Sequence, residues 1–391
     1  MKRREFIAIA GLAPLFLKLG CSSNSNQIIK YTAENKNSFE VLEVSGSYYE
    51  IGQQVGKHFQ KNINEIVSLR QDWIKSLQSK VDNDKGKTYS DKLYSEAKKY
   101  YPHLIDELKG TADGAAVDFD IIWLMTISAE LGSLSTEIPG CSTVYNKNDE
   151  VQWLFHNEDS NKAYYHRNFI IKAHPPSGVS FYSLCYPGMP PGIGQSFNSK
   201  GIIHTANYIG TNNPMVGIPR LIIGRAALES KTLDEAIGIV TKMPRAVSWH
   251  HNIGSTKTKE YCSVETLPDG KFEVFRPTGL YCHTNHLIHE KTKGYEYQDI
   301  DFSNSCSTSR LEVLTGEIKN TTEPITNPNK ILKWMSSHQK SPWSPCRHPD
   351  DKETIQTVAT AFFDFKTEVF RIYKGNPCEA VPNRLFENYR F

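Results

Sequence analysis

The sequence predicts an α+β protein built from layered antiparallel sheets, and three features of its pattern lead to this fold class. Residues 48–133 carry apolar side chains at helical spacing, whereas the chain after Pro139 is a series of short β-rich runs. Turn residues separate these runs, as in Pro268-Asp269-Gly270. Strand clusters in mostly hairpin order, with helices between them, favour a layered α+β architecture.

The first half is predicted to contain three helices. In IGQQVGKHFQKNINEIVSLRQDWIKSL, apolar residues recur at steps of mostly three and four, at Ile51, Val55, Phe59, Ile63, Ile66, Val67 and Ile74. YSEAKKYYPHLIDELKGTADG predicts a second helix, interrupted or kinked near Pro102 and ended by Gly110 and Gly114. FDIIWLMTISAELGS predicts a third helix.

Seven runs predict strands in the second half: STVYN, VQWLFH, NFIIKAH, VSFYSLCYP, GIIHTANYIG, YCSVETL and FEVFRP. Two helices are expected among them. One runs from Pro219 to Glu229, and the other is TLDEAIGIVTKM, where Thr232 and Glu235 form a capping box. The C-terminal TVATAFFDFKTEVFRIYKGNP predicts an antiparallel hairpin.

The composition excludes several classes of function. The formal net charge is +2 and 23% of the 391 residues are charged, with no basic run long enough to follow a phosphate backbone. We therefore expect no nucleic-acid partner. No apolar stretch of roughly 20 residues occurs in the body of the chain, so no membrane-spanning helix is expected there. GxSxG is absent, so a serine hydrolase of the nucleophile-elbow kind is not expected. Gly192-Ile193-Gly194 lacks the third glycine and the following helix of a phosphate loop, and no cofactor is expected.

Residues 1–21 predict an export signal. MKRREFIAIAGLAPLFLKLGC has a basic start, a short apolar core and a small residue before Cys21. Arg3-Arg4 resembles a twin-arginine signal, and LGC resembles a bacterial lipobox, although Lys18 stands where an apolar residue is usual. We expect a protein of the bacterial cell envelope that faces the periplasm and is anchored only by a lipid on Cys21. Ordinary cleavage and a free periplasmic enzyme are the alternative. Residues 22–47 are read as a tether and a first strand.

Two further sets of side chains, six cysteines and three histidines, are candidates for disulfides and for a metal site. Six scattered cysteines form no CxxC pair and are expected to be mostly buried thiols, although an oxidising compartment permits disulfides: Cys185, Cys262, Cys282, Cys306, Cys346 and Cys378. His283, His286 and His289 lie at steps of three. On a strand such side chains alternate in direction, so one metal could not bind all three. We expect hydrogen-bonded loop histidines and no metal.

Cys141 is the candidate nucleophile. Taken alone, it could be a buried apolar residue on a strand. Gly140 precedes it and gives a backbone that can distort and a carbonyl that can be reached. If the Gly140–Cys141 peptide is cut, Cys141 gains a free α-amine, whose reference pKa is about 7.7–8.0. That amine could take the thiol proton at neutral pH, so one residue would supply both nucleophile and base.

Six motifs in this order resemble the N-terminal-nucleophile (Ntn) hydrolases, specifically the acyl-coenzyme A:6-aminopenicillanic acid acyltransferase, or peptidase C45, family. GSYYEIGQQVGKHF resembles the helix-opening segment of that family, PGCST its autocleavage site, and FNSKGIIHTANYIG its N-x-x-G-L-x-x-x-x-N segment. CHTNH, STSR and CRH follow. The resemblance implies a four-layer αββα sandwich of stacked antiparallel sheets over residues 141–391. The helical segment 48–140 would remain bound as a small subunit after cleavage at Gly140.

The resemblance also implies roles for individual residues. Cys141 matches the nucleophile, and Asp159 the carboxylate that holds the new α-ammonium. Asn207 and Asn285 match the asparagines of the oxyanion hole and the amine contact. Arg310 matches an arginine near the thiol, whose charge favours the thiolate. Bile-salt and penicillin V hydrolases usually carry R-N-x-D, whereas this sequence has HNED, which weakens the case for bile salts.

These features predict an exported, self-processing cysteine hydrolase. It would cleave a small-molecule amide, non-peptide or peptide-like, or transfer its acyl group through a thioester on Cys141. Trp153, Tyr186 and Tyr208 could face the substrate, although core packing would explain them equally well. A catalytically inactive lipoprotein that uses the same fold as a binding module is the alternative.

Overall fold

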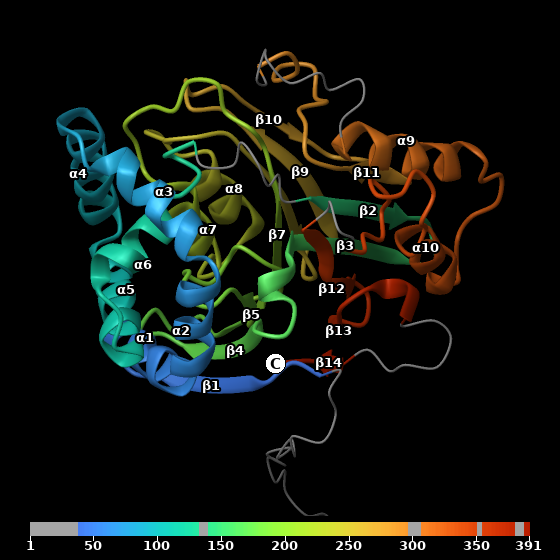
Figure 1. Ribbon diagram of the computed structural model, residues 1–391. Helices are drawn as coiled ribbons and strands as arrows, with labels where there is room; N and C mark the ends of the chain where they lie inside the picture. The colour runs from blue at the N-terminus through green and yellow to red at the C-terminus, as the bar shows by residue number, and fades with distance from the viewer. Residues whose placement is uncertain (1–37, 133–139, 296–305, 350–353, 380–386) are drawn as a thin grey trace, which may run out of the picture. The chain divides into compact units, whose positions relative to one another are not determined.

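Two β-sheets form the centre of the fold (Figure 1). The structure is a computed structural model that describes residues 38–132, 140–295, 306–349, 354–379 and 387–391. One sheet has the strand order β1-β4-β5-β6-β7-β8-β9-β10, and the other has the order β11-β2-β3-β12-β13-β14. The predicted signal with Cys21, and residues 133–139 ahead of the predicted cleavage site, lie outside the described residues.

The eight-stranded sheet contains β1 (Val41–Ser45), β4 (Phe169–His174), β5 (Phe181–Cys185), β6 (Ser196–Asn198), β7 (Ile202–Tyr208), β8 (Trp249–Ser255), β9 (Glu260–Thr266) and β10 (Phe272–Phe275). The six-stranded sheet contains β2 (Cys141–Lys147), β3 (Gln152–Asn161), β11 (Tyr281–His283), β12 (Ile355–Asp364), β13 (Val369–Lys374) and β14 (Glu387–Tyr389). The pairs of neighbouring strands are antiparallel except β1 with β4, which run parallel.

The two sheets stack face to face. Tyr145 of β2 and Leu154 of β3 share one apolar cluster with Ile170, Leu184 and Tyr261 of the larger sheet. The rings of Tyr145 and Tyr261 stack with their centroids 4.3 Å apart. Because successive side chains of a strand point to opposite faces, the odd-numbered residues of β2 face the larger sheet, and Cys141 is one of them.

Helices cover the outer face of each sheet. Those on the larger sheet are α1 (Tyr48–His58), α2 (Gln60–Leu69), α3 (Gln71–Val81), α4 (Asp84–Tyr100), α5 (Pro102–Ala115), α6 (Phe119–Thr126), α7 (Arg220–Ala227) and α8 (Leu233–Val240). On the smaller sheet, α9 (Cys306–Lys319) and α10 (Pro328–Met335) pack against Val144 and Phe155. The order helix, sheet, sheet, helix confirms the predicted αββα sandwich with a helical N-terminal segment. No helix among the described residues combines the length and the apolar character needed to cross a bilayer.

Two details of the helical segment differ from the prediction. The first predicted helix is divided into α1, α2 and α3, because the backbone leaves the helical region at Phe59 and at Arg70. Phe59 stacks on Phe169 of β4, so the break lets the apolar stripe follow the sheet. Gly110 and Gly114 do not end α5, which continues to Ala115.

These glycines instead let α5 approach α1 closely. A Cβ atom on Gly110 would lie 2.0 Å from the carbonyl oxygen of Tyr49, and one on Gly52 would lie 1.9 Å from that of Glu107. No side chain fits between backbones at such distances. The G-x-x-x-G spacing in α1 therefore serves helix packing.

Candidate active site

Cys141 is the first residue of β2, and both its amide nitrogen and its carbonyl oxygen are hydrogen-bonded to side chains. Its amide nitrogen donates a hydrogen bond to Asn285 Oδ1 at 2.8 Å. Its carbonyl oxygen accepts a hydrogen bond from Arg310 Nη1. Arg310 Nη2 also donates to Asn285 Oδ1, at 2.7 Å. Asn285 and Arg310 therefore form one polar unit around the nitrogen that self-cleavage would turn into an amine.

A side chain at position 140 would crowd the polar groups around it. A Cβ atom there would lie 2.7 Å from Asp159 Oδ2, 2.9 Å from Arg347 Nη1 and 3.1 Å from Arg310 Nη2. The carbonyl oxygen of Gly140 accepts a hydrogen bond from the amide nitrogen of Asp159 at 2.8 Å. The Gly140–Cys141 peptide is thus enclosed by one carboxylate and two guanidinium groups.

Alternation along β3 places two neighbouring carboxylates on opposite faces of the sheet. In register, Cys141 lies opposite Glu158. The Cys141 Sγ, a His156 ring nitrogen and a Glu158 oxygen lie within 4.8 Å of one another. Asp159 points the other way, towards Gly140 and Arg347. The thiol therefore shares its face with Glu158 and His156, while Asp159 lies beside the Gly140–Cys141 peptide.

The Asp159 carboxylate is buried and only half satisfied. Oδ1 accepts a hydrogen bond from Thr357 Oγ1 at 2.6 Å, whereas Oδ2 has no hydrogen-bond partner among the described residues. Burial raises the pKa of Asp159, although Arg310 and Arg347 act to lower it. An unpaired acceptor beside Gly140 is suited to receive a new ammonium group.

Burial also raises the pKa of the Cys141 thiol well above its ordinary value. The charges of Glu158 and Asp159 add to this effect, and together these influences outweigh Arg310, which acts to lower the pKa. The effect of Arg310 has the sign that we predicted from the sequence, but it does not dominate in the uncut chain.

Asn207, on β7, is connected to the other predicted site residues through one intervening side chain, that of Thr143. Its Oδ1 accepts hydrogen bonds from Asn252 Nδ2 at 2.8 Å and from Thr143 Oγ1 at 3.2 Å, and it lies 2.9 Å from His250 Nδ1. Its Nδ2 is buried and has no partner among the described residues. The structure thus gathers Cys141, Asp159, Asn285 and Arg310 around one peptide and connects Asn207 to them through Thr143.

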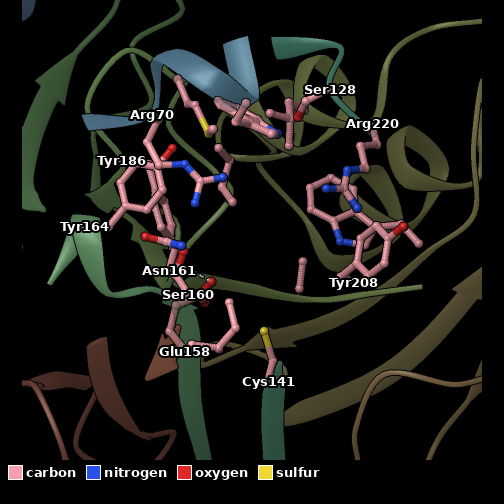
Figure 2. A pocket seen from close by; sticks show the side chains of 17 residues that line it. Arg70, Ser128, Cys141, Glu158, Ser160, Asn161, Tyr164, Tyr186, Tyr208 and Arg220 are labelled. Atoms are coloured by element: carbon pink, nitrogen blue, oxygen red, sulfur yellow. Dashed lines mark hydrogen bonds between the residues drawn. The ribbon is translucent and has the colours of Figure 1, made fainter. Parts of the chain in front are cut away.

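A cavity of about 760 Å³, part of it open to solvent, lies in front of Cys141. Figure 2 shows the Cys141 sulfur pointing into it, with Glu158 and Tyr186 on one side and Tyr208 and Arg220 on the other. Two of the three predicted substrate-facing aromatics, Tyr186 and Tyr208, line this cavity. Trp153 does not, because it packs in the outer core of the smaller sheet.

Arginines stacked on aromatic rings form much of the cavity wall. The Arg70 guanidinium lies 4.9 Å from the Trp73 ring centroid, and that of Arg220 lies 4.6 Å from the Tyr208 centroid and 5.3 Å from that of Trp249. The helical segment therefore supplies Arg70 and Trp73 to a site whose nucleophile belongs to the sheet. Sequence reasoning missed both residues because no motif marks them.

Glu158 and His156 were also left out of the predicted catalytic set. The Tyr186 hydroxyl donates to Glu158 Oε1 at 2.8 Å, and His156 Nε2 lies 3.3 Å from Glu158 Oε2. The hairpin register between the two predicted strands could have indicated Glu158, because it pairs with Cys141.

His283, His286 and His289 make hydrogen bonds as expected, but His283 is the last residue of β11 and does not lie in a loop. His283 Nε2 lies 2.8 Å from Glu265 Oε1, and His286 Nδ1 lies 2.7 Å from Ser307 Oγ. His289 donates its backbone N–H to Glu265 Oε2 at 3.2 Å. The Ile288 amide and the Thr292 hydroxyl complete the Glu265 contacts, so this carboxylate is already occupied.

Residues 144–379 match the model of the family described as acyl-coenzyme A:6-aminopenicillanic acid acyl-transferase. The β-alanyl-dopamine/carcinine hydrolase of Drosophila melanogaster is 25% identical over 375 residues, which cover 89% of this chain and 96% of that protein.

Two solved structures are more distant. A Caenorhabditis elegans N-acylethanolamine-hydrolyzing acid amidase ortholog has 10% identity and a TM-score of 0.39, covering 58% of this chain and 93% of its own. A variant of the conjugated bile acid hydrolase of Clostridium perfringens has 12% identity and a TM-score of 0.42, covering 64% and 97%. Since the family match extends over more than half of the chain, this protein belongs to the acyl-coenzyme A:6-aminopenicillanic acid acyltransferase family of Ntn hydrolases and is an amide hydrolase or acyltransferase.

Proposed function

We propose that the chain cuts itself between Gly140 and Cys141 and then uses Cys141 to cleave a small-molecule amide. The observation that carries this proposal is the enclosed Gly140–Cys141 peptide, whose nitrogen contacts Asn285 while the thiol faces a cavity. The acyl group of the substrate passes to the sulfur as a thioester. Water or an amine then releases it, which gives hydrolysis or transfer.

Self-cleavage begins when the Cys141 sulfur attacks the Gly140 carbonyl carbon. The Asp159 amide, 2.8 Å from that carbonyl oxygen, stabilises the charge that develops on it. The C–N bond breaks, the nitrogen takes a proton and becomes the α-amine, and Gly140 is held as a thioester. Water hydrolyses the thioester and leaves a carboxylate on Gly140 and a free thiol on Cys141.

In turnover, the new α-amine accepts the thiol proton as the sulfur attacks the substrate carbonyl. Asn285 Oδ1, which already accepts from this nitrogen, keeps the amine oriented, and Asp159 Oδ2 receives the ammonium. The unpaired Asn207 Nδ2 is an available donor for the oxyanion. The tetrahedral intermediate collapses to the thioester and the amine departs.

The cavity favours substrates with an aromatic group. Its walls present the rings of Trp73, Tyr164, Tyr186, Tyr208 and Trp249, which suit a flat apolar group. The Drosophila relative is a hydrolase of β-alanyl-dopamine, by its name an amide of an amine that carries a ring. We infer that this chain prefers amides in which the acyl group is small and the amine carries an aromatic ring.

The test is a panel of small-acyl amides that differ in the amine, with release of the amine as the readout. We expect amines that carry an aromatic ring to be released with the highest kcat/KM, and added hydroxylamine to capture the acyl group as a hydroxamate. Cys141→Ala should abolish both, and Cys262→Ala, a buried cysteine outside the site, should retain them. Turnover by Cys141→Ala would exclude the thioester route.

We also propose that the enzyme is exported and anchored in the bacterial cell envelope, on the basis of Arg3-Arg4 and Cys21. Replacing both arginines with lysine should retain the precursor in the cytoplasm. Cys21→Ser should move the protein from the membrane fraction to the soluble periplasmic fraction. If labelled fatty acid never enters the wild type, the lipid anchor is excluded.

A further inference from the structure

Four side chains outside the active site converge where three segments of the chain meet. His338 follows α10, Cys346 and His348 lie in the loop before β12, and Cys378 lies in the short helix η3 (Pro377–Glu379) after β13. One nitrogen or sulfur atom of each residue lies within 4.8 Å of those of the other three. His348 Nε2 is 3.3 Å from Cys378 Sγ and 3.6 Å from Cys346 Sγ.

The two nitrogen–sulfur distances at His348 agree with those of a tetrahedral zinc site. Zn–S bonds of about 2.3 Å and Zn–N bonds of about 2.0–2.1 Å at tetrahedral angles place sulfur and nitrogen about 3.6 Å apart. Two thiolates and two imidazoles are a ligand set that suits Zn²⁺, whereas Mg²⁺ and Ca²⁺ require oxygen. Four protein ligands leave no position for a substrate or water, as in structural sites.

We propose that His338, Cys346, His348 and Cys378 bind one structural Zn²⁺ ion. The surrounding contacts support the ligands. The Cys346 amide donates to the carbonyl of Ser337 at 3.1 Å, which holds the His338 segment beside the loop. Asn376 Nδ2 donates to Cys346 Sγ at 3.4 Å, an outer contact of the kind that orients a metal-binding thiolate.

The proposed zinc site would fix the loop that carries Arg347, whose side chain reaches the Gly140–Cys141 peptide. Arg347 stands between the ligands Cys346 and His348, and its side chain lies beside Gly140 and Asp159. Its backbone exchanges two hydrogen bonds with Thr357, each 3.0 Å long, and Thr357 Oγ1 donates to Asp159 Oδ1. The metal would therefore hold Arg347 and Asp159 in place without touching the substrate. This consequence rests on the proposed function, whereas zinc binding itself does not.

The test measures zinc in the purified, dialysed full chain by elemental analysis. We expect about one equivalent per chain, both in the wild type and in Cys141→Ala, so that the result is independent of self-cleavage. Cys378→Ser and His348→Gln should lose the zinc, Asn376→Ala should weaken its affinity by roughly 10–100-fold, and Cys262→Ala should keep it.

A second measurement uses the wild-type protein, so the proposal can be tested even if the variants fail to fold. Wild-type protein reconstituted with Co²⁺ should show the visible bands of a tetrahedral ion and near-ultraviolet thiolate-to-cobalt charge transfer. Thiol counting after denaturation with a chelator should find Cys346 and Cys378 reduced. A disulfide between these two cysteines, or reduced thiols with neither stoichiometric zinc nor the cobalt spectrum, would overturn the proposal.

Discussion

At the scale of single residues, the environment of Cys141 sets the pH at which it can react. Burial, followed by the charges of Glu158 and Asp159, raises the pKa of this thiol. Glu158 shares the cavity with the sulfur, so removing its charge should stabilise the thiolate and lower that pKa.

We therefore expect Glu158→Gln to move the pH dependence of Cys141 alkylation by iodoacetamide to lower pH. In protein that has cut itself as proposed, the thiol and the free amine would titrate as a coupled pair, so the midpoint that is compared would belong to both groups. Glu150→Gln, an exposed change in the turn after β2, is the matched control and should leave the midpoint unchanged. A midpoint that stays constant or rises in Glu158→Gln would show that this carboxylate does not act on the thiol.

Asn285 should affect turnover without supplying the nucleophile. Its side-chain oxygen accepts from both Cys141 N and Arg310 Nη2. We expect Asn285→Ala to lower kcat by up to about 10²-fold, because the α-amine loses the acceptor that orients it. Steady-state kinetics on protein that has already been processed separates this effect from a defect in self-cleavage. An unchanged kcat would remove Asn285 from the site.

At the scale of elements, the close contact between α1 and α5 stabilises the packing of the helical segment. Gly110→Ala would place a methyl group 2.0 Å from the Tyr49 carbonyl oxygen, so the helices must move apart. We expect a loss of about 1–3 kcal/mol in the free energy of unfolding, measured by urea denaturation. Gly316→Ala in α9 is the control, because nothing lies within 4 Å of its added Cβ. That control should be neutral or stabilise by up to about 1 kcal/mol.

Helices and strands with strong local patterns could be predicted from the sequence. The positions at which helices break or pack against one another could not. The strands that carry Cys141 and Asp159 contain β-rich runs separated by turn residues, so their existence followed from the sequence. The break at Phe59 follows instead from its stacking on Phe169, a residue far along the chain that no local window contains. The role of Gly110 was misjudged for the same reason, since its partner is the backbone of another helix.

At the scale of the whole molecule, buried histidines should make stability depend on pH. Burial, with the charge of His156, lowers the pKa of His204 to about 4, and burial lowers that of His289 to about 4. The unfolded chain has an ordinary value near 6.5, so between pH 6.5 and 4 it binds more protons than the folded chain. Stability is then complete above about pH 6.5 and falls as the pH decreases towards 4.

We expect thermal unfolding midpoints to fall steadily from pH 6.5 to 4, with His204 alone accounting for up to about 3 kcal/mol. His204→Gln should reduce the slope of stability against pH over this interval, even if it lowers stability at neutral pH. A stability that is constant or increases as the pH falls from 6.5 to 4 would contradict this reading of the buried histidines.

The architecture of the molecule could be predicted from the sequence more fully than the set of residues that forms each site. The ordered motifs around Cys141, Asn285 and Arg310 implied the sandwich and the cleavage peptide, and the structure brings these residues together. Arg70 reaches the cavity, and Cys378 reaches His348, only through the tertiary fold. Their irregular spacing in sequence carries no signal, which is why the sequence indicated Tyr186 and Tyr208 of the cavity wall but neither Arg70 nor the cluster of Cys378 and His348.

The central claim is that Cys141 becomes the first residue of a mature chain, and the intact mass of the purified protein under denaturing conditions tests it most directly. We expect two chains, the larger comprising residues 141–391 with Cys141 as its N-terminal residue, and a single uncut chain for Cys141→Ala. A wild-type protein that remains a single uncut chain and still hydrolyses amides at its full rate would contradict the claim.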